Sequence, residues 1–306
     1  MLAIIQHNFT GIDGLTVSQR PRPHLTAEGV LIAMETLPVV PSDWHKETNL
    51  HATAEQAAQL PRVIGIGGVG TVIAVGQHRD QQLLNQRVLV MHPQGTYQEV
   101  ICNTNSDWLF PLPDTLSNEA AATLTAGPGT ALVLANFIKQ HPSDQIMMTG
   151  ANSVIGLILC QLLGPAYPGL TPIVSPASQA YFHHILPDFP CYLANHVKTT
   201  TGRRLLVDIA GSPRLLQQLS ATQHPAEIVS IALQSTELTV PFTFVHEDFD
   251  PLIYQHFIQD VTEQKLQLPI DRSFTFMDTQ LAQHYAKDTH SRGRVLVDLR
   301  HGKLQV

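Results

Sequence analysis

The sequence contains little cysteine and no surplus of positive charge, and both absences narrow what the chain can be. Its 306 residues include three cysteines, Cys102, Cys160 and Cys191, which are far apart and form no CxxC pair. No disulfide framework is expected, and the thiols fit a reducing compartment. Lysine and arginine number 18 against 25 aspartates and glutamates, which gives a net charge of -7. That balance argues against nucleic acid or an anionic membrane as a partner.

Long apolar stretches are scarce as well. Stretches such as Ile155–Leu163 fall well short of the roughly 20 residues that span a bilayer. Residues 1–9 alternate as a first strand does and lack the form of a signal peptide. We therefore expect a cytoplasmic protein that does not associate with membranes. Its length suits two domains of roughly 150 residues each.

The pattern of apolar residues changes along the chain. In the first third, short β-branched runs are separated by Pro, Gly, Asn and Asp, which predicts a small β-barrel-like domain. These runs are Leu2–Gln6, Gly29–Thr36, Gly68–Val75, Arg87–Met91 and Gln98–Cys102. A helix is expected after Ser117, and from Gln145 strands and helices alternate. Alternation of this kind predicts a parallel, doubly wound sheet. The end of the chain, with a strand at Arg294–Leu299, is expected to return to the first domain.

A glycine turn lies at the first strand-to-helix transition. The predicted strand Gln145–Thr149 leads into the segment Gly150-Ala151-Asn152-Ser153-Val154-Ile155-Gly156, which opens a helix. Small residues let the chain reverse and let a pyrophosphate approach the backbone, while free N–H groups at the helix start attract its charge. We predict that these seven residues bind a dinucleotide, with Gly156 letting the helix pack closely on its strand. Asn152 replaces the second glycine of the strict GxGxxG pattern, so a tight turn that binds nothing is the alternative.

A series of short motifs then supports a family. In chain order they are Val40-Pro41-Ser42-Asp43, the glycine-rich stretch from Pro61 to Gly76, Gly95–Val100, Pro111–Asp114 with Ala120–Ala122 and Gly129–Ala131, Gly150–Ser153, Val207-Asp208 with Gly211, and Ser291–Val297. In this order they resemble the medium-chain dehydrogenase/reductase family, in its zinc-independent quinone-reductase and enoyl-thioester-reductase branches. The match runs over nearly the whole chain.

This resemblance implies an α/β fold that joins a Rossmann-type doubly wound parallel sheet to a GroES-like β-barrel-type catalytic domain. We predict that residues 1–116 and 266–306 form the GroES-like catalytic domain and that residues 117–265 form the Rossmann cofactor-binding domain. A homodimer is expected.

The zinc ligands of the family have no counterpart in this sequence. Zinc-dependent members carry a Cys where this chain has Val40 or Pro41, and Gly-His-Glu where it has Gly65-Ile66-Gly67. None of these replacements offers a thiolate, imidazole or carboxylate to zinc. The four-cysteine lobe of the zinc enzymes is missing too, so no metal is predicted.

The resemblance also implies chemistry and cofactor. It indicates an oxidoreductase that transfers hydride from NADPH to a quinone, enone or related conjugated carbonyl substrate. NAD enzymes usually carry an acid at the end of the second strand to hold the ribose, and residues 173–179 contain none. We expect Ser175 and Ser178 to contact the 2′-phosphate. Gln179 replaces the family's usual lysine there, and Arg203 or Arg204 is the candidate for a compensating cation.

The catalytic candidates come from the resemblance as well. Substrate reduction requires a proton, and the family places the segments of His45 and Tyr97 beside the nicotinamide. Thr130 is expected at the nicotinamide ribose or carboxamide, and Asp43 is assigned to the cofactor site, although fixing the turn is its more plausible role. All four are expected to converge on one cleft between the domains.

An alternative function stays open at this stage. The reductase branches usually carry Asn where this chain has Val40, and the catalytic tyrosine of enoyl-thioester reductases has no clear counterpart. The alternative is therefore a catalytically inactive NADPH-binding sensor or structural relative of the same fold.

Overall fold

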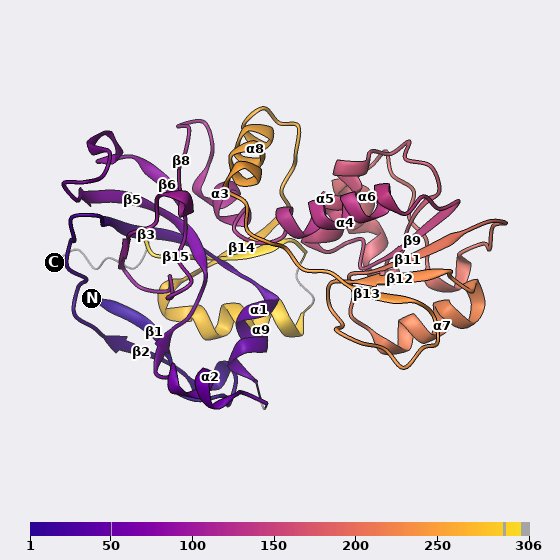
Figure 1. Cartoon of the computed structure of the whole chain (residues 1–306), viewed down its shortest axis with the longest axis horizontal. Coiled ribbons are helices and arrows are strands. Elements are labelled where there is room, and N and C mark those ends of the chain that lie inside the picture. Colours follow the sequence, from indigo (N-terminus) through magenta and orange to yellow (C-terminus); the bar gives the residue numbers. More distant parts are fainter. Residues whose placement is uncertain (50, 290–291, 301–306) are drawn as a thin grey trace. The chain divides into compact units, whose positions relative to one another are not determined.

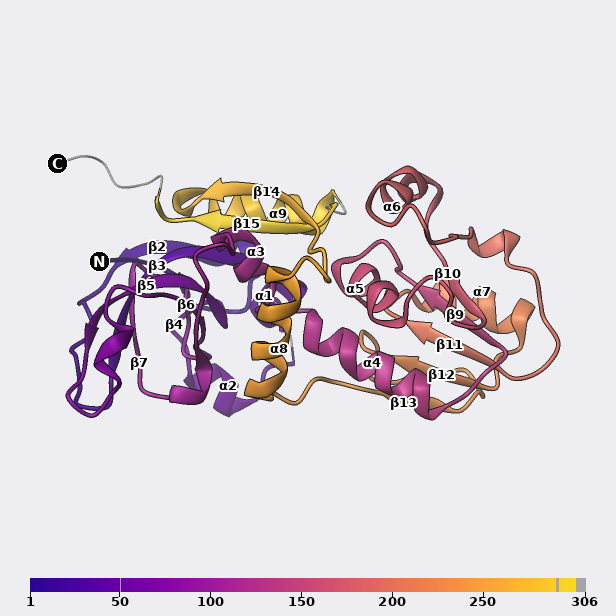
Figure 2. The same ribbon diagram turned by 90° about the horizontal axis from the view of Figure 1, so that it is seen from above.

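The computed structural model describes residues 1–49, 51–289 and 292–300. The chain forms two compact units, which Figures 1 and 2 show in two views. The β-rich unit comprises residues 1–126 together with the chain from Pro251 onward, and the α/β unit comprises Gly127–Asp250. The described residues after Pro251 thus belong to the same unit as the start of the chain.

Two helices belong to a different unit from the one expected. The sequence-based boundaries placed α3 (Asn118–Thr123) and α8 (Pro251–Thr262) with the cofactor domain, whereas both lie in the β-rich unit. The reason is packing. Helix α3 contacts strands of the larger sheet, and Tyr254 of α8 stacks on Phe110 with ring centroids 5.6 Å apart. Periodicity along the chain identifies a helix but does not say which core the helix covers.

The β-rich unit is built around a seven-stranded sheet. Its strand order is β14-β15-β3-β5-β6-β8, and β7 pairs with β3 as well. The bounds are β3 Val30–Val39, β5 Gly67–Val75, β6 Arg87–Met91, β7 Val100–Asn103, β8 Leu109–Pro111, β14 Ile270–Thr275 and β15 Arg294–Asp298. A smaller sheet has the order β2-β1-β4, with β1 Leu2–Gln6, β2 Leu15–Gln19 and β4 Arg62–Val63. Strand β3 is the centre of this unit because β5, β7 and β15 all pair with it.

Short helices complete the β-rich unit. Besides α3 and α8 they are α1 Pro41–Glu47, α2 Ala54–Ala58 and α9 Thr279–Asp288. Helix α1 follows β3 directly and starts with Pro41, a residue suited to the first helical turn because it needs no amide partner there. Its inner face carries Asp43 and Glu47, which are four residues apart and both buried.

The α/β unit contains a five-stranded parallel sheet with the order β10-β9-β11-β12-β13. Its elements are α4 Pro128–Gln140, β9 Gln145–Thr149, α5 Val154–Leu163, β10 Leu170–Pro172, α6 Gln179–Ile185, β11 Arg204–Asp208, α7 Pro213–Gln223, β12 Glu227–Ser230 and β13 Phe242–Phe244. Helices α4 and α5 cover one face and α7 covers the other (Figure 1). Met147, Leu206 and Ile228 face Leu216 and Leu219 of α7 in a common apolar cluster. The predicted doubly wound sheet is confirmed.

One buried carboxylate connects the carboxyl ends of three neighbouring strands. Asp208, at the end of β11, is 1% exposed. Its Oδ1 accepts from the Thr149 hydroxyl of β9 at 2.9 Å and from the Gly211 amide at 3.1 Å, and its Oδ2 accepts from the Ser230 hydroxyl of β12 at 2.9 Å. Both hydroxyls in turn accept backbone amides of the loops that follow, those of Ile209, Ala210, Ala232 and Leu233. The loops at this edge are therefore held by one side-chain network.

Removing this carboxylate tests that network. We expect Asp208→Ala to lower the free energy of unfolding by about 3 kcal/mol, because hydrogen bonds to a charged group are lost and buried donors are left without an acceptor. Asp188→Ala is the matched control, since Asp188 is exposed and the change should stay within about 0.5 kcal/mol. Urea unfolding of both variants measures the difference. Equal stabilities would mean that the loops keep their conformation without Asp208.

Candidate functional site

The glycine turn lies between β9 and α5, where the sequence placed it. Gly150 has a φ of +65°, a left-handed conformation that favours glycine. Ser153 precedes the helix, and its hydroxyl accepts the amide of Gly156 at 3.1 Å. A Cβ on Gly156 would lie 2.5 Å from the Gly150 oxygen and 2.7 Å from the Ala151 Cα. Gly156 thus packs against the turn rather than farther along the strand, and it is needed for the turn to close.

A cavity of about 400 Å³ adjoins this turn at the carboxyl edge of the sheet. It is lined by Gly150, Asn152, Ile173, Val174, Ser175, Pro176, Leu193, Ala194, Asn195, Ala210, Leu215 and Gln218. The lining residues are uncharged, and most of them are apolar. The cavity also contacts Ala210, whose amide the Thr149 hydroxyl accepts, so the Asp208 network shapes one of its walls.

The predicted cofactor residues have different environments around this cavity. Gly150, Asn152 and Ser175 line it directly, and Ala151 is fully buried behind them. The helix-start residues Ser153, Val154 and Ile155 are partly exposed. Ser178 is 3% exposed, with its hydroxyl 2.9 Å from that of Ser175. Ser175 is therefore the exposed member of this pair and the one with access to a ligand.

The predicted compensating cation is not at this cavity. Arg204 begins β11, at the edge of the sheet opposite to the strands' carboxyl ends, and donates to the Thr200 and His224 carbonyls. Arg203 forms an ion pair of 2.7 Å with Glu227, which begins β12. Both guanidinium groups are thus engaged at the amino ends of the strands, so neither is placed to act as the compensating cation for which the sequence made them candidates. The amino ends and the carboxyl ends of these parallel strands are separated by the length of the strands, about 3.3 Å per residue.

Thr130 lies in the first turn of α4, and its hydroxyl already has a partner. It donates to Oε2 of Glu247 at 3.1 Å. Oε1 of the same carboxylate fills the space beside Gly129, where a Cβ would lie 2.0 Å from it. A negative charge at the start of a helix of this length is favoured by the helix dipole. The structure therefore adds Glu247 to the surroundings of Thr130, a neighbour that no local sequence pattern indicated.

In the β-rich unit, Tyr97 is enclosed. It is 0% exposed, and its hydroxyl donates to the Pro38 carbonyl at 2.9 Å. Burial holds the pKa of Tyr97 well above its usual value, and the nearby acids Asp43 and Glu47 raise it further. A hydroxyl bonded to the backbone in this way holds the strand end in place. We therefore do not retain Tyr97 as the proton donor that the resemblance implied.

His45 has the opposite environment. It is exposed on α1, and its ring lies edge-on to Trp44 with centroids 6.1 Å apart. Among the described residues, this contact with Trp44 is the interaction shown for the imidazole ring, and the catalytic role of His45 stays a prediction. Asp43, one turn away, is 5% exposed and accepts the Val40 amide at 2.9 Å. Asp43 thus caps the start of α1, the role that the sequence favoured for it.

The buried acid Asp43 belongs to a charged cluster. Burial raises the pKa of Asp43 to about 6, against the lowering effects of the Val40 amide, Lys46 and Arg294. Arg294 is itself buried and donates to the Val39 carbonyl at 3.1 Å and to the Ala126 carbonyl at 2.6 Å. Asp43 and Arg294 therefore fix the junction of β3, α1 and the end of the chain.

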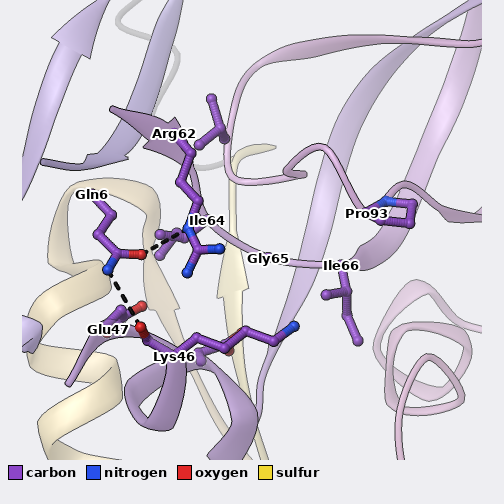
Figure 3. Close-up of a pocket in the computed structure, with 10 residues that line it drawn as sticks. Gln6, Lys46, Glu47, Arg62, Ile64, Gly65, Ile66 and Pro93 are labelled. Carbon is purple, nitrogen blue, oxygen red and sulfur yellow. Dashed lines mark hydrogen bonds between the residues drawn. The ribbon is translucent and has the colours of Figure 1, made fainter. Parts of the chain in front are cut away.

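A small polar cavity opens beside this cluster (Figure 3). It has a volume of about 40 Å³ and is lined by Gln6, Asp43, Lys46, Glu47, Arg62, Val63, Ile64, Gly65, Ile66 and Pro93. Gly65 and Ile66 in its wall belong to the segment that the resemblance matches to the Gly-His-Glu of zinc-dependent members. Arg62 donates to Gln6 at 2.9 Å, a bond drawn in Figure 3. Cations and carboxyl groups thus line one small cavity.

Glu47 is the functional candidate that the sequence did not single out. It is 1% exposed, and its Oε1 accepts Nε2 of Gln283 on α9 at 3.0 Å. Its Oε2 is buried and has no hydrogen-bond partner among the described residues. Burial raises the pKa of Glu47 to about 7; the Gln283 bond opposes this shift, Asp43 adds to it and Arg62 opposes it. The available signal was the four-residue spacing from Asp43, which puts both acids on one helix face.

Two searches of the described residues gave negative findings. Across residues 1–49, 51–289 and 292–300, no group of three or more His, Cys, Asp or Glu side chains is placed to hold a metal ion. In the same residues, no helix has both the length and the apolar character of a membrane span.

Comparison with solved structures supports the fold, and comparison with curated sequences finds relatives that are oxidoreductases. No family model matches the chain. The quinone oxidoreductase from Coxiella burnetii superposes with a TM-score of 0.83 at 19% identity, covering 98% of this chain and 99% of that one. A putative NADPH:quinone reductase from Bacillus thuringiensis gives 0.78 at 20% identity, covering 97% and 98%. The chain therefore has the fold predicted for it, a Rossmann-type domain joined to a GroES-like domain.

A curated relative narrows the class. The mitochondrial enoyl-[acyl-carrier-protein] reductase of Caenorhabditis elegans is 31% identical over 155 residues, which cover 49% of this chain and 43% of that protein. The chain thus matches less than half the length of this relative. Together the comparisons confirm the resemblance to the zinc-independent branch of the medium-chain dehydrogenases/reductases.

The raised pKa of Glu47 makes stability depend on pH. In the folded chain Glu47 keeps its proton up to about pH 7, whereas an ordinary glutamate releases it near pH 4.5. The stability that the bound proton contributes to the folded state is therefore fully present below about pH 4.5 and is lost as the pH rises to about 7. We expect Glu47→Gln to gain stability relative to the parent across this interval, by up to about 3 kcal/mol, since one pKa unit corresponds to about 1.4 kcal/mol. Urea unfolding at a series of pH values measures it.

The exposed Glu55 of α2 provides the control, because Glu55→Gln makes the same chemical change in water. Its stability difference from the parent should not vary with pH in this way. A pH-independent difference for Glu47→Gln would show that Glu47 titrates as a solvated carboxyl does.

Proposed function

We propose that the chain is an NADPH-dependent oxidoreductase that reduces a quinone, enone or related conjugated carbonyl compound without zinc. The observation that carries this proposal is the uncharged cavity at the carboxyl edge of the parallel sheet, with the glycine turn on one side and Ser175 on the other. Ligands of open α/β sheets bind at this edge. The names of the structural neighbours support the reaction class, since they include quinone oxidoreductases.

The residues present fit a dinucleotide. The absence of a Cβ at Gly150 and Gly156 lets the turn close, so that the start of α5 offers its partly exposed backbone to a pyrophosphate. Residues 150–156 would hold the pyrophosphate, Ser175 the ribose phosphate and Thr130 the nicotinamide end. When bound, NADPH supplies the hydride. The chain's own contribution is to orient the cofactor, exclude water and deliver a proton.

The preference for NADPH rests on a missing charge. Acidic residues that hold the ribose of NAD would repel a 2′-phosphate, and the cavity lining has none. It has no cation either, since Arg203 and Arg204 are engaged elsewhere. We therefore infer a modest preference that depends on hydrogen bonding by Ser175.

A second candidate function is supported by specific observations. Tyr97 is buried with its hydroxyl bonded to the Pro38 carbonyl, and His45 is exposed on α1. Val40 offers no polar side chain at the position where the reductase branches usually carry Asn. A chain with these features would suit a sensor or structural protein that binds NADPH without reducing anything. NADPH oxidation with a panel of quinones and enones decides between the two, because the sensor turns over none of them. A cytoplasmic homodimer remains our expectation for either candidate.

Cofactor titration tests the binding half of the proposal. We expect NADPH to bind about tenfold more tightly than NADH, since one hydrogen bond to a charged phosphate contributes about 1.5 kcal/mol. Intrinsic fluorescence measures both affinities. Ser175→Ala should weaken NADPH binding and leave NADH binding unchanged. Equal affinities in the parent would mean that nothing in this cavity recognises the 2′-phosphate.

Gly156→Val provides the matched control for the site itself. Its side chain would overlap the Gly150 oxygen and the Ala151 backbone, so both cofactors should lose affinity. Overpacking of this kind also typically costs about 1–3 kcal/mol of stability, which thermal unfolding measures. A folded variant that binds NADPH as the parent does would show that the phosphate site lies elsewhere.

A further inference from the structure

The start of α4 carries a carboxylate that comes from the other end of the α/β unit. Thr130 donates its hydroxyl proton to Oε2 of Glu247 at 3.1 Å, and Oε1 fills the space beside Gly129. Gly127, which precedes the helix, has no side chain, so the carboxylate stands where a capping side chain would otherwise be. All four residues belong to the α/β unit.

This carboxylate lies at the carboxyl edge of the parallel sheet, on the side away from Ser175. Glu247 follows β13, the last strand on one side of the sheet, whereas Ser175 follows β10 on the other side. The glycine turn follows β9, so three strand spacings, about 14 Å, separate it from β13. A dinucleotide with its ribose phosphate at Ser175 and its pyrophosphate at the glycine turn therefore extends its nicotinamide half towards Glu247.

The pair formed by Thr130 and Glu247 offers a ligand acceptors and negative charge. Thr130 uses its single hydroxyl proton on Glu247, so that its oxygen can only accept from a ligand, and a carboxylate has no proton to donate. The positive end of the α4 dipole offsets about half an elementary charge, which leaves the start of the helix negative. Both side chains are partly exposed. Such a surface suits hydrogen-bond donors and positive charge, and it repels anions.

We propose that Glu247 makes the site bind the oxidised cofactor more tightly than the reduced one and thereby favours the release of hydride. This inference rests on the proposed function, which places the nicotinamide end at Thr130. The nicotinamide ring is neutral in NADPH and positively charged in NADP⁺. Glu247 therefore gains an attractive interaction as the hydride leaves, and an interaction that grows towards the transition state lowers the barrier.

Glu247 keeps its charge throughout and forms no covalent bond. The substrate gains the hydride with both electrons of the cofactor's C–H bond, and solvent supplies the proton that completes the reduction. NADPH is thus oxidised and the conjugated carbonyl compound is reduced. No further oxidant or reductant is needed.

Comparing the two oxidation states isolates the charge of the ring. NADPH and NADP⁺ carry the same phosphates and the same adenosine, so the contributions of the glycine turn and Ser175 to affinity are common to both. The ratio of the two dissociation constants therefore reports the surroundings of the nicotinamide ring. A Glu247 that only occupied the place of the cofactor would weaken the binding of both forms alike.

Isothermal titration calorimetry of the whole chain with NADPH and with NADP⁺ tests the inference. We expect the parent to bind NADP⁺ about tenfold more tightly, the effect of one opposite charge near a partly exposed site. Glu247→Gln keeps an acceptor for the Thr130 hydroxyl but removes the charge, and it should bring the two dissociation constants to within about twofold of each other. Asp248→Asn is the matched control, because it makes the same change at a side chain that is 96% exposed, where solvent screens the charge. It should keep the parent's ratio.

The outcomes separate the inference from the proposed function. A Glu247→Gln ratio equal to the parent's overturns the inference alone, and so does equal tightening of both forms, which would make Glu247 a competitor of the cofactor. A parent that binds neither form overturns the nucleotide site and the inference together. If Glu247→Gln does not fold, the parent still decides, because NADPH bound at least as tightly as NADP⁺ contradicts a nicotinamide ring held beside a carboxylate.

Discussion

The carboxylate of Asp208 holds together the edge of the sheet on which the candidate nucleotide site depends. It accepts hydroxyl protons from the ends of β9 and β12 and an amide from the loop that follows β11. A buried charge is tolerated only when it is fully bonded, so this network requires the three strands to end in register. Gly150 packs against Ala210, whose amide belongs to the same network. The shape of the glycine turn is thus set partly by a residue far along the chain.

The two units treat buried acids in different ways. Asp208 has donors on both oxygens, and such a group is structural because its surroundings satisfy the charged form. Glu47 has a donor on one oxygen only, so its surroundings favour the neutral form. The difference lies in the neighbours and not in the residue type. A carboxylate with donors on both oxygens fixes strands, whereas burial with a donor on one oxygen favours the protonated form.

The sequence predicted the α/β unit better than the β-rich unit, and the reason is physical. Strands such as β9 are buried on both faces, so they read as continuous apolar runs between glycine turns. The β-rich unit includes strands as short as Arg62–Val63, whose pairing with β1 depends on the tertiary fold. Edge strands such as β14, half exposed and mixed in composition, carry too little periodicity to be recognised.

The candidate site shows the same division. The glycine turn was predictable because its residue types follow from local backbone geometry. The enclosure of Tyr97 was not, since its partner Pro38 lies on another strand. Glu47 was overlooked because a glutamate is normally exposed, although its spacing from Asp43 placed it on the inner face. Local chemistry can be read from a segment, whereas burial depends on what packs over that segment.

The contact of Glu247 with the first turn of α4 bears on how this chain can vary during evolution. The carboxylate occupies the volume in which any side chain at position 129 would begin, so glycine there and glutamate at 247 form one steric unit. A side chain added at 129 would displace the carboxylate end of Glu247 from the start of α4, by rotation of that side chain or by its replacement with a shorter residue. These two positions should therefore covary among descendants of this sequence, with glycine kept wherever the long acid is kept.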